Sequence, residues 1–185
     1  MSDLKQIFIS GSKNKQDIKK ATTNYQKDKE IKMRVASENW RFSQEYFIYE
    51  NQFKLINEIA ENNYKAISEV AQIVSKQINN KISGYKQQDT LKKRYNREKF
   101  LTFEHIINTM LECELKCRYC KLEINVLYDI SREMKQWSVD RINNDLGHNN
   151  DNYHLACLEC NLKRRRKPDD KFLFTKQLNL IKQDN

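Results

Sequence analysis

Glycine, proline and long apolar stretches are what this chain has least of. Its 185 residues include three glycines and one proline, so few positions interrupt a helix, and a mostly helical chain is expected. No apolar run is long enough to cross a membrane, and no signal-peptide core follows Met1. These absences predict a soluble, intracellular protein with no membrane partner.

Histidine and cysteine are also few, with three histidines and five cysteines. Four of the cysteines form two CxxC pairs, and the odd total argues against a complete disulfide framework. In a reducing compartment such pairs favour metal binding over disulfide formation. The remaining cysteine, Cys113, is expected to be half-buried at the end of a helix.

Basic residues outnumber acidic ones, 34 to 25, and the formal net charge of +9 suits a polyanionic partner. Much of this charge lies in one run directly after the second CxxC pair. The run consists of Lys163, Arg164, Arg165, Arg166 and Lys167. We expect these side chains to bind DNA phosphates in a salt-sensitive, largely sequence-independent way. The alternative is a solvated helix end whose charge complements the helix dipole.

Composition divides the chain into a polar tail (1–38), a helical, basic region (39–100) and a C-terminal domain (101–185). In the middle region, apolar residues at helical spacing predict a helix over 52–81. Ser83 and Gly84 would end that helix, since glycine is a common C-terminal cap. The aromatic residues that precede the helix are expected to belong to the core.

The C-terminal domain is expected to combine helices with two short strands, so the fold class is α+β and mostly helical. The predicted helices cover 102–114, about 157–167 and 170–182, and the predicted strands cover 124–128 and 137–142. A loop rich in Asn and Asp is expected between 142 and 152. Pro168 would stop the helix that carries the basic run.

The two CxxC pairs predict a metal centre. The four cysteines are Cys117, Cys120, Cys157 and Cys160. Four thiolates suit a tetrahedral Zn²⁺ ion and leave no open position, so this zinc would be structural rather than catalytic. We expect it to stabilise a domain whose apolar core is small.

Residues 113–167 resemble an HNH endonuclease domain of the ββα-metal fold with a four-cysteine zinc site. Besides the cysteines, the resemblance depends on Asp140-Arg141-Ile142, the Gly147-His148 pair, Asn152, and Asn161 directly after the last cysteine. The Asp-Arg-Ile variant is common in phage and large DNA viruses. The resemblance implies a viral protein, in the host cytoplasm or nucleus, that hydrolyses DNA phosphodiester bonds. Cutting both strands with one site per chain would require a homodimer.

The resemblance also assigns roles to individual residues. Asp140 and Asn161 would hold a catalytic Mg²⁺ or Mn²⁺ ion, for which their oxygen atoms are suitable ligands. Asn152 would orient the loop that carries the base. Arg141 stands where most of the family has its general-base histidine. Its guanidinium stays protonated, so Arg141 would hold the scissile phosphate instead of accepting a proton.

The general base must therefore come from elsewhere. His148, in the loop after Asp140, is the first candidate because imidazole titrates near neutral pH. His154 is the second candidate and Tyr153 the third, whereas His105 is expected to be structural. Two other functions stay open: a zinc-containing nucleic-acid-binding module that has lost catalysis, and an interaction protein whose N-terminal helix binds another chain.

Overall fold

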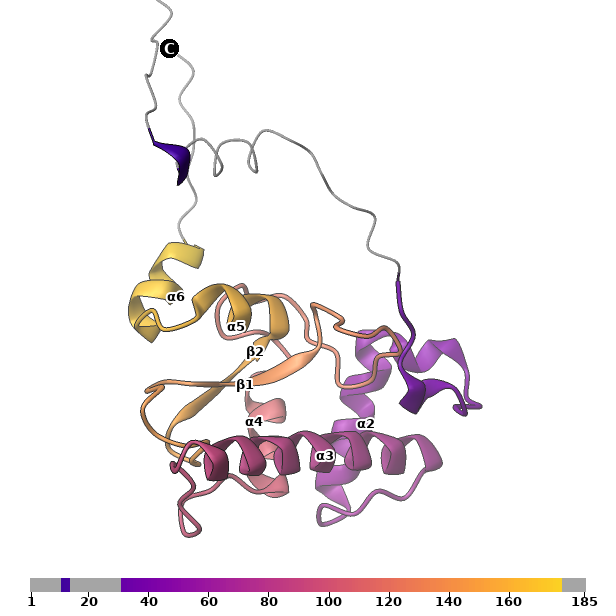
Figure 1. Cartoon of the computed structure of the whole chain (residues 1–185). Helices are drawn as coiled ribbons and strands as arrows, with labels where there is room; N and C mark the ends of the chain where they lie inside the picture. Colours follow the sequence, from indigo (N-terminus) through magenta and orange to yellow (C-terminus); the bar gives the residue numbers. More distant parts are fainter. Residues whose placement is uncertain (1–10, 14–30, 178–185) are drawn as a thin grey trace, which may run out of the picture. The chain divides into compact units, whose positions relative to one another are not determined.

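The computed structural model describes residues 11–13 and 31–177 (Figure 1). The chain divides into two units, Met1–Lys32 and Met33–Asn185, and the elements discussed below belong to the second. The predicted tail (1–38) lies mostly outside the described residues. Its last part belongs to the second unit, since Met33 forms a β-bridge with Ile130 and the backbone N–H of Arg34 donates to the carbonyl of Asp129 at 2.7 Å.

Two helices replace the single helix predicted over 52–81. They are α2 (Tyr49–Glu61) and α3 (Glu69–Leu91), and two short 3-10 turns, η1 (Val35–Ser37) and η2 (Gln44–Phe47), precede them. The chain breaks after α2 because Asn63 and Tyr64 adopt left-handed backbone conformations, with φ of 54° and 61°. The prediction of one helix was wrong because the apolar spacing continues across this break.

The start of α3 is fixed by a hydrogen-bonded cap. Ser68 Oγ accepts from the backbone N–H of Ala71 at 3.2 Å, as an N-cap serine does. Glu58 of α2 accepts from the backbone N–H of Ser68 at 2.8 Å, which joins the two helices. The predicted end at Gly84 was wrong: Gly84 lies within α3, which continues to Leu91.

The C-terminal part contains α4 (Phe103–Glu112), β1 (Trp137–Arg141), β2 (Tyr153–Cys157), α5 (Leu158–Arg164) and α6 (Asp169–Gln177). The helix predicted over 102–114 is confirmed by α4, which Thr102 caps through its side chain. Cys113 lies half-buried at its C-terminal end, as predicted. The two strands are antiparallel, and Asp140 is opposite His154.

One predicted strand is wrong and one observed strand was missed. Residues 124–128 form no strand beyond one isolated bridge between Asn125 and Gln136. The side chain of Gln52 accepts from the backbone N–H groups of Val126 and Leu127, both at 2.8 Å. The partner of β1 is instead β2, most of which lies between the predicted loop (142–152) and the predicted helix (about 157–167). The described part of the chain thus has five α-helices and one two-stranded sheet, a mixed α+β fold that is mostly helical.

The helices and the two strands share one hydrophobic core. Its fully buried members include Ile56, Ile59, Val74, Ile78, Ile106, Ile107, Met110, Leu115 and Trp137. On one side of the strands lies α3, and α5 and α6 lie on the other (Figure 1). Tyr85 of α3 accepts a hydrogen bond from the backbone N–H of Val139 at 3.1 Å, so α3 covers an edge of β1. Of the helices described, none combines the length and apolar character that crossing a membrane requires.

Candidate metal centre and the charged site beside it

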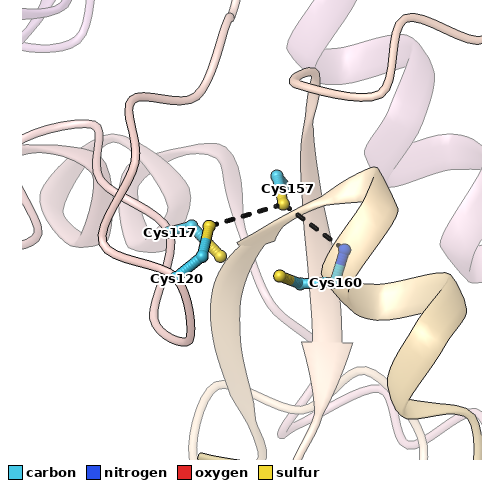
Figure 2. A group of neighbouring side chains, drawn as sticks. All are labelled: Cys117, Cys120, Cys157 and Cys160. Atoms are coloured by element: carbon cyan, nitrogen blue, oxygen red, sulfur yellow. Dashed lines mark hydrogen bonds between the residues drawn. The ribbon is translucent and has the colours of Figure 1, made fainter. Parts of the chain in front are cut away.

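The four cysteines of the CxxC pairs come together at the junction of β2 and α5 (Figure 2). Their Sγ atoms all lie within 4.8 Å of one another. Cys117 and Cys120 form one turn, in which the backbone N–H of Lys121 donates to the carbonyl of Cys117 at 3.0 Å. Cys157 ends β2 and caps α5, accepting from the backbone N–H of Cys160 at 3.4 Å. The predicted ligand set can therefore hold one metal ion.

The acid–base properties of the cluster fit such an ion. A hydrogen bond with the Cys157 thiol lowers the pKa of Cys117 to about 5. Burial raises the pKa of Cys160 to about 12. The thiolate is therefore favoured at Cys117 and disfavoured at Cys160, where a bound cation would replace the proton. Four sulfur ligands close the coordination shell, so this centre supplies no open position for chemistry.

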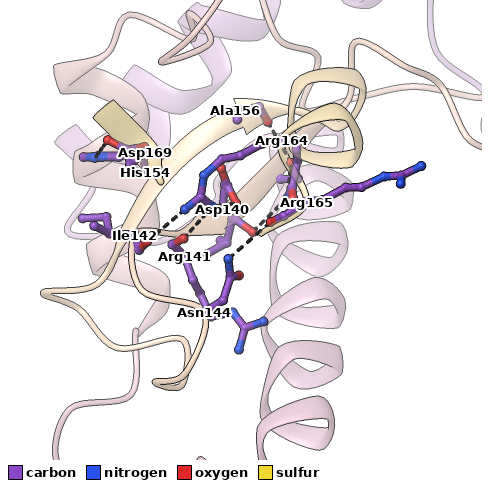
Figure 3. A network of polar contacts seen from close by, with 12 residues as sticks. Asp140, Arg141, Ile142, Asn144, His154, Ala156, Arg164, Arg165 and Asp169 are labelled. Atoms are coloured by element: carbon purple, nitrogen blue, oxygen red, sulfur yellow. Dashed lines mark hydrogen bonds and ion pairs between the residues drawn. The ribbon is translucent and has the colours of Figure 1, made fainter. Parts of the chain in front are cut away.

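Asp140, predicted as a magnesium ligand, ends up in a buried ion pair (Figure 3). Its carboxylate is 4% exposed; Oδ1 accepts from Nη1 of Arg164 at 2.7 Å and Oδ2 accepts from the Tyr119 hydroxyl at 2.6 Å. Arg164 is fully buried and also donates to the carbonyls of Arg141 and Ile142, at 2.7 and 2.9 Å. Burial raises the pKa of Asp140, while the Tyr119 hydrogen bond and the Arg164 charge lower it.

This burial corrects the prediction for Arg164. The sequence placed it among five exposed phosphate-binding residues, but its guanidinium faces inward, where Nη1 and Nη2 donate to protein acceptors. Lys163, Arg165, Arg166 and Lys167 are exposed, and Lys163 pairs with Glu159 one turn earlier. The exposed basic run therefore has four members rather than five.

Tyr119 links Asp140 to a second carboxylate that sequence reasoning missed. Its hydroxyl lies 2.6 Å from Oδ2 of Asp140 and 2.6 Å from Oδ1 of Asp169, at the start of α6. The single hydroxyl proton of Tyr119 can be donated to either carboxylate. Burial, together with the hydrogen bonds to these two carboxylates, raises the pKa of Tyr119. Asp169 in turn lies 3.5 Å from Nε2 of His154. Nothing in the spacing of Tyr119 or Asp169 marked them as members of this site.

Asn161, the other predicted magnesium ligand, lies beside β1. Its Nδ2 donates to Ser138 Oγ and to the carbonyl of Val139, both at 3.1 Å. Asn161 thus contacts the two residues that precede Asp140 in β1. A divalent cation does not fit there in this conformation, since both Asp140 oxygens are occupied and a guanidinium already supplies the positive charge.

The loop between the strands holds the other predicted catalytic residues. Asn152 closes this loop: its Oδ1 accepts from the backbone N–H of Asn143 at 2.9 Å, and its Nδ2 donates to the carbonyl of Gly147 at 3.0 Å. Arg141 also binds the loop, with Nη1 donating to the carbonyl of Leu146 at 3.0 Å. Both residues thus shape the segment that follows β1.

His148, the first candidate base, lies against α3. Asp89 accepts from its backbone N–H at 2.6 Å and lies 2.8 Å from its Nδ1, and the ring stacks on Tyr85 with centroids 4.5 Å apart. Burial lowers the pKa of His148. Among the described residues, no hydrogen bond joins His148 to Asp140 or Asn161. The histidine connected with Asp140 is His154, which Asp169 and Tyr119 link to it.

Comparisons with protein-family models, with curated proteins and with solved structures gave no match. Any functional assignment therefore depends on the residues of this chain and their geometry.

Proposed function

We propose that this protein is a zinc-stabilised, DNA-binding domain of the HNH type that does not itself hydrolyse DNA. The observation that carries the proposal is the buried Arg164–Asp140 ion pair. A free carboxylate would repel a phosphate, but here its charge is neutralised internally. The exposed charges of Arg166 and Lys167, which follow Arg164 in the same run, are positive and suit a nucleic-acid backbone.

Zinc is the metal that the four-cysteine cluster suits best. Thiolates select soft or borderline cations, and a closed set of four sulfur ligands is typical of structural zinc. The cluster joins the turn after α4 to the junction of β2 and α5. Zinc would thus hold in place the helix that carries Arg164 and the basic run.

The second candidate is the activity that the HNH resemblance implies, metal-dependent endonuclease. It is favoured by the position of Asn161, whose amide contacts the residue before Asp140. Asp140 and Asn161 would hold Mg²⁺ or Mn²⁺, which would neutralise charge on the phosphate. This function requires Arg164 to leave Asp140 first. His154 is then the better placed base, and double-strand cutting would require a homodimer.

One pair of assays separates the two functions. Wild-type protein and the Asp140→Asn variant are incubated with plasmid DNA and Mg²⁺ or Mn²⁺, and nicking is measured beside a gel-shift assay. We expect the wild type to shift DNA and not to nick it. Nicking by the wild type that Asp140→Asn abolishes, with DNA binding retained, would establish the endonuclease. Failure to bind DNA at all would leave a protein-interaction role as the remaining candidate.

A further inference from the structure

A cavity of about 280 Å³ lies between the loop that follows β1 and the segment that follows α5. The loop lines it with residues 142–145, among them Asn143 and Asn144, and the second segment lines it with Arg164, Arg166, Lys167 and Pro168. The cavity therefore adjoins the Asp140 ion pair but includes none of the atoms of its carboxylate. Figure 3 shows Asn144 and Arg165 meeting across the two segments.

Hydrogen bonds hold the two lining segments in fixed positions. Nδ2 of Asn144 donates to the carbonyl of Arg165 at 3.2 Å, which ties the loop directly to the end of α5. Arg94 also holds the loop, since its Nη1 donates to the carbonyl of Asn144 at 2.6 Å. Arg165 has a φ of 56°, so the chain turns sharply there and brings the next two residues over the cavity. The site is preformed and does not depend on a ligand for its shape.

The lining of the cavity is positive. Neither Arg166 nor Lys167 has an ion pair among the described residues, and both are exposed. Nε of Arg164 is a buried donor that lacks a hydrogen-bond partner. The single acid in the lining, Asp145, is 86% exposed and lies 3.6 Å from Arg94. An anion in the cavity would therefore lie close to hydrogen-bond donors and positive charges and would be only weakly repelled by Asp145.

We propose that this cavity binds a phosphate group of a nucleic-acid backbone. The inference rests on the proposed DNA binding and assigns one phosphate to a defined place. A guanidinium and an ammonium from one segment and two side-chain amides from the other match the acceptor oxygens of a phosphodiester. The cavity accounts for a difference within the basic run: Arg166 and Lys167 hold the phosphate, whereas Lys163 and Arg165 lie outside the lining.

The test compares two double variants of the full chain that each remove two positive charges. Arg166→Gln/Lys167→Gln alters the cavity, and Lys163→Gln/Arg165→Gln is the matched control in the same run. Binding to a short DNA duplex is measured by fluorescence anisotropy over a range of salt concentrations. We expect the cavity variant to lose roughly 10-fold in affinity and its salt slope to fall by about 1, with a loss below about 2-fold in the control. Equal losses of affinity in both variants would overturn the proposed phosphate site, although the proposed DNA-binding function would still hold.

A second measurement does not depend on DNA. Inorganic phosphate is titrated into ¹⁵N-labelled wild-type protein, and the amide signals of Asn143, Asn144 and Lys167 are followed by NMR. Shifts confined to these residues, and absent from the cavity variant, support the site. No shift at these positions would overturn it. If phosphate binds there but the wild type does not bind DNA, the cavity stands as a phosphate site and the proposed function fails.

Discussion

The guanidinium of Arg164 donates a 2.7 Å hydrogen bond to Oδ1 of Asp140, and neither side chain is more than 4% exposed. Removing two charges from water is costly, and this pair offsets the cost with further hydrogen bonds to Tyr119 and to two backbone carbonyls. Asp140 is also the carboxylate that the HNH resemblance assigns to a divalent cation. We therefore expect the pair to affect stability and, if the protein is an endonuclease, metal binding.

Breaking this pair from one side should strongly destabilise the protein. Arg164→Met leaves the Asp140 carboxylate buried and uncompensated, so we expect a loss of about 3–5 kcal/mol in the free energy of unfolding. Urea denaturation followed by circular dichroism measures it. The Asp140→Asn/Arg164→Met double variant should recover part of the loss. Arg165→Met, at the neighbouring exposed position, is the control and should change stability by less than about 0.5 kcal/mol. Equal effects at positions 164 and 165 would contradict the buried pair.

Removing the metal should destabilise the whole compact unit, because the cysteine cluster and the helices share one core. We expect a chelator, or the Cys160→Ser variant, to release zinc and to lower the thermal unfolding midpoint well below that of the wild type. Metal content is measured by elemental analysis and unfolding by circular dichroism. Cys113→Ser is the matched control, since Cys113 lies outside the cluster. Unchanged metal content in Cys160→Ser would contradict the assignment.

Two glycines should respond to alanine in opposite directions. A Cβ at Gly147 would lie 2.5 Å from the carbonyl oxygen of Arg94 and 2.9 Å from Oδ2 of Asp89, so Gly147→Ala should cost about 1–3 kcal/mol. A Cβ at Gly84, within α3, meets nothing within 4 Å, so Gly84→Ala should stabilise by about 0.5–1 kcal/mol. Chemical denaturation of the Gly147→Ala and Gly84→Ala variants measures both changes in stability. A neutral Gly147→Ala would mean that the loop does not approach α3 this closely.

Local sequence patterns were sufficient to predict the helices and metal ligands that depend on residues close together in the chain. The helical spacing around Ile106 and Met110 predicted α4, and each CxxC pair places its own two sulfurs together. Long-range pairing was not visible in the same way. Arg164 is one of five similar basic residues, and its partner Asp140 lies 24 positions away. Only the geometry of α5 against β1 decides which member of the run turns inward.

The missed strand has a related cause. β2 lacks the alternation of buried and exposed side chains that marks many strands, because four of its five residues are buried and His154 is half-buried. A short apolar run of this kind fits a strand or the start of a helix equally well. Its identity is decided by pairing with β1, which the spacing of residues within β2 does not encode.

A half-buried lysine, Lys81, should make stability depend on pH. The Lys81 ammonium lies 4.5 Å from the centre of the Trp137 ring, and burial, with a smaller contribution from the charge of Arg34, lowers its pKa to about 7. The unfolded chain, with a lysine pKa near 10.5, binds more protons than the folded chain between these two values. The contribution of Lys81 to stability therefore rises with pH across that window and is constant below it.

The comparison of wild type with Lys81→Met isolates this effect. Between about pH 7 and pH 10, the difference in unfolding free energy should shift in favour of the wild type by about 3–4 kcal/mol. Urea denaturation at several pH values measures the shift. Lys86→Met, which removes an exposed lysine further along α3, is the control for the loss of one positive charge from this helix. A flat difference for Lys81→Met would mean that its ammonium remains hydrated, and that Trp137 and α3 pack less closely than described here.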